Sequence, residues 1–305
     1  MQVIWLRAFV AVAETGSVVR AALDLSRPQS RVSAYLAQLE EDFGVTLFDR
    51  GKRPLALTVA GELLLGHARE ALRALDAART DFEHLSGRRF GTVRLACIPS
   101  VAGAYAPALI NRFTRAEPGI AIQMHEAATS SIARIIVDGQ AELAIVPAAY
   151  VSATPEITAV PLWREPLLAV LAASHPRASQ DSIAPSEITG EVLITAGSAE
   201  GGRGLSPEVA PLFAAEDVPS LSTRRVASPH TLVALVRRGG AVGITNPLAL
   251  ELTGSEGIVA RPLAAAGAER TVVLAWRRGR ELSSHSAALR RFIEAAAPPP
   301  AARRA

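Results

Sequence analysis

The fold of this chain is decided between residues 29 and 50, which read QSRVSAYLAQLEEDFGVTLFDR. Val32, Leu36, Leu39 and Phe43 recur at the spacing of an α-helix, so the pattern predicts a short helix with one narrow buried stripe. A compact basic hairpin follows, rich in arginine and closed by a proline. Such a helix, placed after a turn and before a basic hairpin, is typical of small domains that present one helix to a duplex.

The outer face of this helix is polar and carries small or hydrogen-bonding side chains. Gln and Arg make paired hydrogen bonds to base edges, Ser bonds bases or phosphates, and a basic turn suits phosphate contact. A small helical bundle with a solvated face remains the alternative for the pattern alone. We expect double-stranded DNA to be contacted by Arg27, Gln29, Ser30, Arg31, Ser33, Arg50, Lys52 and Arg53.

Two helices precede the turn. The first carries a single apolar stripe that includes Leu6 and Phe9, and Gly16 ends it. Ser17 is a good N-cap for the second helix, which is short. Together these elements predict an all-α winged helix-turn-helix domain over residues 1–57.

The order of residues in this region resembles the LysR-type transcriptional regulators. Pro28 and Ser30 depart from the family, which usually has Ser or Thr and often Pro at these positions, and so do Arg31 and Ala34, where Ala and Arg are common. No particular base contact is therefore transferred to residues 31 and 34. The resemblance is carried by Leu6-Arg7-Ala8-Phe9-Val10-Ala11-Val12-Ala13-Glu14, Gly16-Ser17, Ala21-Ala22, Leu25, Gln29, Val32-Ser33, Leu39-Glu40, Gly44-Val45, Leu47-Phe48, Arg50 and Leu57-Thr58-Val59-Ala60-Gly61-Glu62.

Composition limits the class of protein. The chain has 305 residues, of which 49% are hydrophobic, so two packed domains are expected. A net charge of +3 excludes a chain that is basic throughout, and any affinity for DNA must be local. No apolar run is long enough for a membrane span, and the N-terminus lacks the pattern of a secretory signal. We therefore expect a cytoplasmic protein that does not contact membranes.

The residues that bind metals or react with oxidants are few. The histidines lack metal-ligand spacing, so neither a metal nor a cofactor is expected. Cys97 is the only cysteine, which excludes an internal disulfide. We expect it to be a buried small hydrophobe, with a redox-sensing thiol as the alternative.

A long helix is predicted over residues 58–85, with Thr58 as its N-cap. Apolar residues spaced alternately four and three apart form a heptad seam with a charged exterior. In the resembled family this helix is the dimerisation element, so we expect a homodimer or homotetramer. A second apolar line keeps open the alternative that the seam packs on the chain itself. The expected seam consists of Leu64, Ala68, Ala71, Leu75, Ala78 and Phe82.

Beyond a hinge at residues 86–91, strand and helix patterns alternate, which argues for parallel sheets flanked by helices. The resemblance implies a two-lobed α/β effector domain of the periplasmic-binding-protein type (type 2) over 92–297. Lobe I is expected at about 92–163 and 270–297 and lobe II at about 166–265, with crossovers near Trp163–Pro166 and Pro262–Thr271. The tail, residues 298–305, is expected to be disordered.

Ligands of open α/β sheets bind beyond the carboxyl ends of the strands. Hydroxyl and amide side chains follow several predicted strands, and Ser100 and Thr129 match positions that contact effectors in the resembled family. Each could instead be a helix cap. Because we expect no Lys and few Arg there, a small carboxylate would be held by hydroxyls and helix N-termini. The expected effector site is Ser100, Val101, Thr129, Ser130, Thr195, Thr245 and Asn246.

The favoured function is that of a bacterial, ligand-responsive, sequence-specific DNA-binding transcriptional regulator with a small effector between its two lobes. A solute-binding module of the transport class is the alternative, since it shares the two-lobed half. An enzyme is not expected, because no nucleophile–base motif or phosphate-binding loop is visible.

Overall fold

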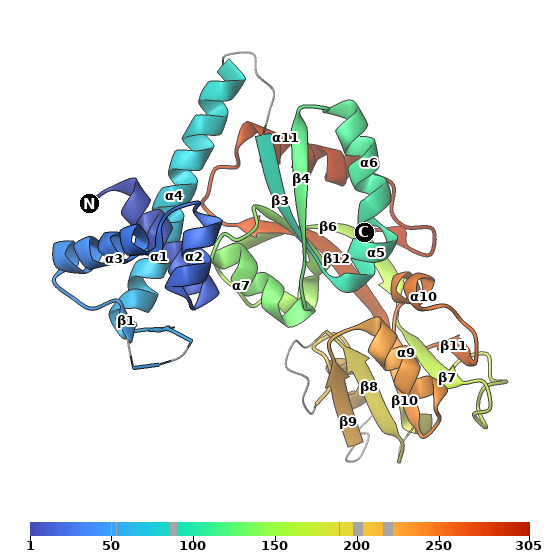
Figure 1. The fold of residues 1–305 in the computed structure, drawn as a ribbon. Coiled ribbons are helices and arrows are strands. Elements are labelled where there is room, and N and C mark those ends of the chain that lie inside the picture. The colour runs from blue at the N-terminus through green and yellow to red at the C-terminus, as the bar shows by residue number, and fades with distance from the viewer. Residues whose placement is uncertain (50, 53, 86–90, 189, 198–203, 216–221) are drawn as a thin grey trace. The chain divides into compact units, whose positions relative to one another are not determined.

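The structure is a computed structural model that describes residues 1–305 except 50, 53, 86–90, 189, 198–203 and 216–221. The chain divides into two compact units, an N-terminal unit of Met1–Gly87 and a C-terminal unit of Arg88–Ala305 (Figure 1). In the part of the chain that is described, every helix is too short or too polar to span a bilayer.

The N-terminal unit consists of helices and one small hairpin. Leu6, Phe9, Val32 and Leu39 form its buried core, as the stripes predict. Phe43 is 47% exposed, because the helix ends there and Gly44 turns the chain away, so its predicted burial is wrong. The elements are α1 (Val3–Thr15), α2 (Val18–Asp24), α3 (Gln29–Phe43), β1 (Phe48–Asp49), β2 (Ala56–Leu57) and α4 (Val59–Leu85).

Several residues that carry the resemblance cap helices or make close contacts in the N-terminal unit. The predicted N-caps are confirmed: Ser17 Oγ accepts from the Arg20 N–H at 3.4 Å, and Thr58 Oγ1 accepts from the Gly61 N–H at 3.0 Å. The Glu40 carboxylate accepts from the backbone N–H of Leu47 at 2.8 Å, which ties α3 to the start of the wing. A Cβ at Gly61 would collide with the Leu47 carbonyl oxygen, so α4 passes the wing at a distance that only glycine allows.

The wing is a hairpin in which β1 and β2 pair antiparallel. The Phe48 ring packs against Phe9 of α1, with 5.4 Å between the ring centroids, and the Leu55 N–H donates to the Gly16 carbonyl at 3.0 Å. The wing is thereby fixed to the helices on both of its sides.

The helix α4 covers the range predicted for the linker, beginning one residue after its cap. Its first turns pack onto its own unit: Ala68 is 1% exposed and Leu72 is 8% exposed. Ala71, Leu75 and Ala78 are exposed, Leu64 is half-buried, and the side chain of Phe82 lies outside the described residues. Ala68 therefore packs on its own chain, as the alternative interpretation has it. For the exposed residues, the dimer seam stays a prediction.

The C-terminal unit holds two sheets, which confirms the predicted two-lobed α/β class. Lobe I is built on a six-stranded sheet in the order β13-β6-β12-β5-β3-β4. Strand β3 pairs parallel with β4 and β5, whereas β12 pairs antiparallel with β5 and β6. Its strands are β3 (Gly91–Cys97), β4 (Ile120–Glu126), β5 (Leu143–Pro147), β6 (Ile157–Pro166), β12 (Glu269–Arg277) and β13 (Arg303–Arg304).

The helices of lobe I pack on this sheet around one apolar core that includes Trp163 and Phe113. One of them, α10, follows a strand of lobe II in the chain but packs on α5, and its Leu248 joins the core of lobe I. The helical segments are α5 (Pro99–Ala104), α6 (Ala106–Ala116), η1 (Thr129–Ser131), α7 (Ile132–Val137), η2 (Ala148–Tyr150), α10 (Pro247–Thr253) and α11 (Ser284–Ala295).

Lobe II is built on a five-stranded sheet in the order β11-β7-β10-β8-β9, with an apolar core on each face. The parallel strands β10, β8 and β9 carry the edge at which a ligand is expected. Its elements are β7 (Leu168–Ala172), η3 (Pro185–Ile188), β8 (Val192–Ala196), α8 (Ala210–Ala214), β9 (Ser222–Val226), α9 (Pro229–Arg237), β10 (Ala241–Thr245) and β11 (Ile258–Pro262).

The chain passes from lobe I to lobe II between the end of β6 at Pro166 and the start of β7 at Leu168, which is where the first crossover is expected. One expectation about the C-terminal unit needs correction. The tail, expected to be disordered, pairs through Arg303 and Arg304 with β6, because β6 is otherwise the edge of the sheet. The predicted limits of the domains and lobes themselves stay predictions, and the hinge falls on residues 86–90, outside the described residues.

Candidate functional site

The polar face predicted on α3 is exposed in the N-terminal unit. Gln29 is the first residue of the helix, and the helix buries Val32, Leu36 and Leu39 on its opposite side. In the wing, Lys52 is exposed, with its Nζ 3.7 Å from Asp49 Oδ2. Arg50 and Arg53 lie outside the described residues. The described members of the predicted set that are exposed on and beside α3 are Arg27, Gln29, Ser30, Arg31 and Ser33.

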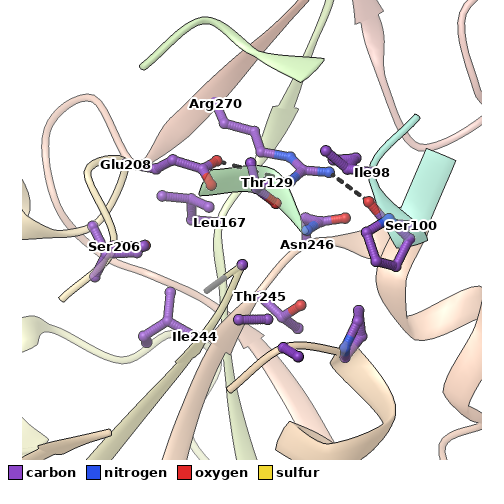
Figure 2. A pocket seen from close by; sticks show the side chains of 16 residues that line it. Ile98, Ser100, Thr129, Leu167, Ser206, Glu208, Ile244, Thr245, Asn246 and Arg270 are labelled. Atoms are coloured by element: carbon purple, nitrogen blue, oxygen red, sulfur yellow. Dashed lines mark hydrogen bonds and ion pairs between the residues drawn. The ribbon is translucent and has the colours of Figure 1, made fainter. Parts of the chain in front are cut away.

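The C-terminal unit has a pocket between its two lobes, shown in Figure 2. Ser100, Thr129, Thr245 and Asn246 of the predicted effector site line it. Its volume open to the centre of a water-sized sphere is about 40 Å³, room for on the order of three water molecules. In this conformation the pocket therefore admits a small group and excludes a bulky one.

The other predicted effector residues lie elsewhere. Val101 is fully buried in the core of lobe I, and Thr195 is 1% exposed within lobe II. Ser130 is exposed, and its backbone N–H donates to the carbonyl of Gly197 across the lobes at 3.0 Å. None of the three is among the described residues that line the pocket.

The alternative that these polar residues are only helix caps is decided case by case. Asn246 is a cap, because its Oδ1 accepts from the Ala249 N–H at 3.0 Å. Ser100 is not the cap of α5, whose N-cap is Ile98. The hydroxyl of Ser100 instead accepts a hydrogen bond from Arg270, at 3.3 Å.

The pocket also contains charged residues that sequence analysis missed. Arg270 of β12 is 6% exposed; its Nε donates to Glu165 Oε1 at 2.9 Å, and its Nη2 lies 2.8 Å from the same oxygen. Its Nη1 lies 3.8 Å from Glu208 Oε2, a residue of lobe II. Figure 2 shows Arg270 lying between Glu208 and Ser100. The described lining thus contains one Arg and no Lys, as expected, but the inference that only hydroxyls and helix N-termini would hold a carboxylate left this guanidinium out.

Burial changes the acidity of these groups. Burial raises the pKa of the Glu208 carboxyl, the Arg270 guanidinium opposes that change, and the Glu165 charge adds to it. Burial also raises the pKa of Tyr150, whose hydroxyl hydrogen-bonds Ser206 of lobe II. Thr129 and Tyr150 both approach Gly197, since a Cβ there would meet Tyr150 Oη at 3.0 Å and Thr129 Oγ1 at 3.1 Å. Polar contacts thus join the two lobes beside the pocket.

Residues placed to bind metals or react with oxidants are scarce in this structure. The described part of the chain contains no group of three or more His, Cys, Asp and Glu side chains placed to hold a metal ion. Cys97 is fully buried in β3, and burial raises the pKa of its thiol to about 12.

Comparison with known proteins agrees with the fold and the resemblance. Residues 4–62 match the family described as bacterial regulatory helix-turn-helix protein, lysR family, and residues 86–298 match the LysR substrate binding domain. The chain belongs to the LysR family. It is therefore a ligand-responsive transcriptional regulator, because a regulatory helix-turn-helix and a substrate binding domain of this family both match.

Individual relatives are distant. The uncharacterized HTH-type transcriptional regulator YbhD of Escherichia coli K12 is 29% identical over 65% of this chain and 62% of its own length. A hydrogen peroxide-inducible genes activator of Dickeya chrysanthemi is 27% identical over 91% of this chain and 90% of its own length. Among solved structures, full-length CbnR complexed with its target DNA superposes with a TM-score of 0.68 at 20% identity, covering 96% of this chain and 99% of CbnR. This last likeness shows the fold alone.

Proposed function

We propose that the N-terminal unit binds double-stranded DNA with α3 in the major groove and the wing on the phosphate backbone. The observation that carries the proposal is the division of α3 into a buried face and an exposed polar face that contains Gln29, Arg31 and Ser33. CbnR, which shares the fold, is described in complex with its target DNA. Because its target is chromosomal, we place the protein in the cytoplasm of its host.

We also propose that the protein works as a homodimer or homotetramer. Ala71, Leu75 and Ala78 lie along α4 at heptad spacing and are exposed, with 47% of Leu75 open to solvent. A glutamate at position 75 would place a charge in that seam, so Leu75→Glu gives monomers in light scattering. Leu63→Glu is the matched control, because Leu63 is 68% exposed and lies off the predicted seam. An unchanged oligomer with Leu75→Glu would place the interface elsewhere.

The effector, in this proposal, binds in the pocket between the lobes and shifts the population of assemblies that differ in the spacing of their recognition helices. Ser100 and Thr129, which face the pocket from lobe I, and Asn246 contribute to binding. We assign no enzymatic activity, because the charged residues of the described lining, Arg270 and Glu208, form an ion pair with each other.

The effector is not a peroxide acting on a thiol, although one relative is named as a hydrogen peroxide-inducible activator. Reaction with an oxidant requires an accessible thiolate. Cys97 is the only cysteine of the chain, it is fully buried, and its pKa is raised to about 12. We therefore propose a reversibly bound small molecule.

DNA affinity of the full chain tests the first proposal, with fragments taken from beside its own gene. Gln29→Ala reduces affinity for the specific fragment by about 1–3 kcal/mol and relaxes sequence preference, because Gln29 makes a base contact. Gln38→Ala is the control, since Gln38 is also exposed but lies nine residues farther along α3. If both substitutions leave specific affinity unchanged, α3 is not the helix that contacts the bases.

A further inference from the structure

The pocket presents two charged side chains of opposite sign, and each keeps hydrogen-bonding capacity that the protein does not use. The Nε of Arg270 donates to Glu165, and its Nη2 contacts Glu165 and donates to Ser100. Its Nη1 makes no hydrogen bond within the described residues, and the nearest charge is Glu208 Oε2 at 3.8 Å. The guanidinium therefore has donors left for an anionic group.

Glu208 is the complementary group. Its side chain is only 12% exposed. The Oε2 atom is buried and has no hydrogen-bond partner among the described residues. A buried carboxylate oxygen without a donor is costly, and burial raises the pKa of Glu208 accordingly. The pocket thus contains an acceptor that a ligand cation would satisfy.

The other charged residues near the pocket add neither a free donor nor a free acceptor to its lining. Glu165 is 1% exposed and is satisfied by Arg270 and by the Trp163 Nε1–H, which donates to it at 3.4 Å. Arg225 of β9 acts on Tyr150 through space, but it is not among the described lining residues. The lining therefore presents one positive and one negative group, side by side.

We propose that the effector is a small zwitterion of the α-amino acid class, with its ammonium group on Glu208 and its carboxylate on Nη1 of Arg270 and the hydroxyl of Thr129. This inference rests on the proposed function, in which the same pocket holds the effector. In an α-amino acid one carbon separates the two charges, which suits pocket groups that lie 3.8 Å apart. A plain carboxylate would leave Glu208 without a donor and close to a like charge, and a plain amine would leave Arg270 unsatisfied. The pocket is also small, which limits the ligand to a short side chain in this conformation.

Calorimetric titration and thermal unfolding of the full chain test this assignment. The probes are the common L-α-amino acids, each with its deamino analogue and its amide, as in alanine, propionate and alaninamide. At least one amino acid binds and raises the Tm, while its deamino analogue and its amide bind at least about tenfold more weakly.

The charge-removing variant E208Q distinguishes recognition of the ammonium group from general binding. It lowers affinity for the amino acid by about tenfold or more and reduces the preference over the deamino analogue. E191Q is the matched control: Glu191 is also a paired carboxylate of lobe II, 2.9 Å from His175 Nε2, but it does not line the pocket. The E191Q variant binds every probe with the wild-type affinity.

The outcomes separate this inference from the proposed function. A deamino acid that binds as tightly as its amino acid, a panel in which no amino acid binds, or an E208Q variant with unchanged affinity overturns the inference. If a carboxylate without an amine binds and changes DNA affinity, the inference fails while the regulatory function stands. If an amino acid binds through Glu208 but DNA affinity does not respond, the pocket assignment holds and the regulatory proposal fails.

Discussion

The recognition helix and the inter-lobe pocket are built in opposite ways. The described side chains proposed to contact bases lie within residues 27–33, and all of them are exposed. The charged groups in and beside the pocket come from three distant parts of the chain and are largely enclosed: Glu208 and Arg270 line it, and Glu165 pairs with Arg270. Substitutions at the helix should therefore change binding alone, whereas those in the pocket should change both folding and binding.

The largest effect we expect comes from Arg270→Met. This change leaves Glu165, which is 1% exposed, and Glu208 without their shared cation. Removing one partner of a buried pair costs about 3–5 kcal/mol, so the C-terminal unit loses that much stability. Urea unfolding measured through Trp163 and Trp276, in a Trp5→Phe background, reports on this unit.

A surface pair provides the control. Arg303 pairs with Glu269 at 2.6 Å, with 66% and 39% of the two side chains exposed, so Arg303→Met costs at most about 1 kcal/mol. Losses of equal size in the two variants would mean that the pair inside the pocket contributes no more than a surface pair.

A pH dependence is the second prediction. Burial raises the pKa of the folded-state Glu208 carboxyl above its value of 4.5 in the unfolded chain. The folded chain therefore holds that proton more tightly, and the stability this provides is complete below the unfolded pKa and is lost as the pH rises through the folded pKa. Glu208→Gln removes the titration, so wild type loses stability relative to this variant as the pH rises.

Urea titrations from about pH 4 to about pH 8 measure that difference, again through Trp163 and Trp276. A difference in unfolding free energy that stays constant over this range would contradict the raised pKa, whatever the ligand turns out to be.

The contrast also explains what the sequence could predict. The caps at Ser17 and Thr58 and the stripe through Val32 and Leu39 are local patterns, and each is present in the structure. Phe43 shares that periodicity but lies at the helix end, where no neighbour covers it. Periodicity predicts which face is apolar, and the packing of neighbours decides whether it is buried.

The pocket shows where local patterns fail. Arg270 donates to Glu165, 105 residues away in the sequence, and to Ser100, 170 residues away. No local spacing in the sequence predicts these contacts. Strand-end hydroxyls such as Ser100 and Thr129 were accessible to prediction, because the carboxyl ends of parallel strands carry ligands in this class of fold. The ion pair that sets the charge of the pocket needed the tertiary structure.

The third prediction concerns the hydroxyl of Ser100, which accepts from Arg270 at 3.3 Å. Ser100→Ala removes the hydroxyl that holds the Arg270 guanidinium at the pocket, and that guanidinium is proposed to bind the effector's carboxylate, so affinity for the effector falls by about 1.5–3 kcal/mol, or about tenfold or more. DNA binding without effector is unchanged, because Ser100 lies in the C-terminal unit. Calorimetry with the amino acid that stabilises wild type provides the measurement.

Ser283→Ala is the control for Ser100. Ser283 caps α11 in the same unit, with its Oγ accepting from the Ser286 N–H at 3.2 Å, but it is not a pocket residue. It costs about 1 kcal/mol of stability and leaves affinity intact. An effector with equal affinity for wild type and Ser100→Ala would show that the Ser100 hydroxyl contributes nothing to binding through Arg270.

The smallest effect we expect is that of Lys52→Ala in the wing. The Lys52 side chain is 68% exposed, and its ion pair with Asp49 at 3.7 Å is weak, so the ammonium group is available for a phosphate. One phosphate contact carries no sequence information, so affinity falls on every duplex alike and the salt slope flattens by about 0.9. Lys52→Arg retains the charge and the affinity.

Because Lys52 is the only lysine of the chain, amine acylation read by mass spectrometry gives a second measurement. Bound DNA protects this one side chain from acylation to the same degree with specific and non-specific duplexes. A loss confined to the specific duplex would instead make Lys52 part of sequence recognition, and the division between a base-contacting helix and a phosphate-contacting wing would fail.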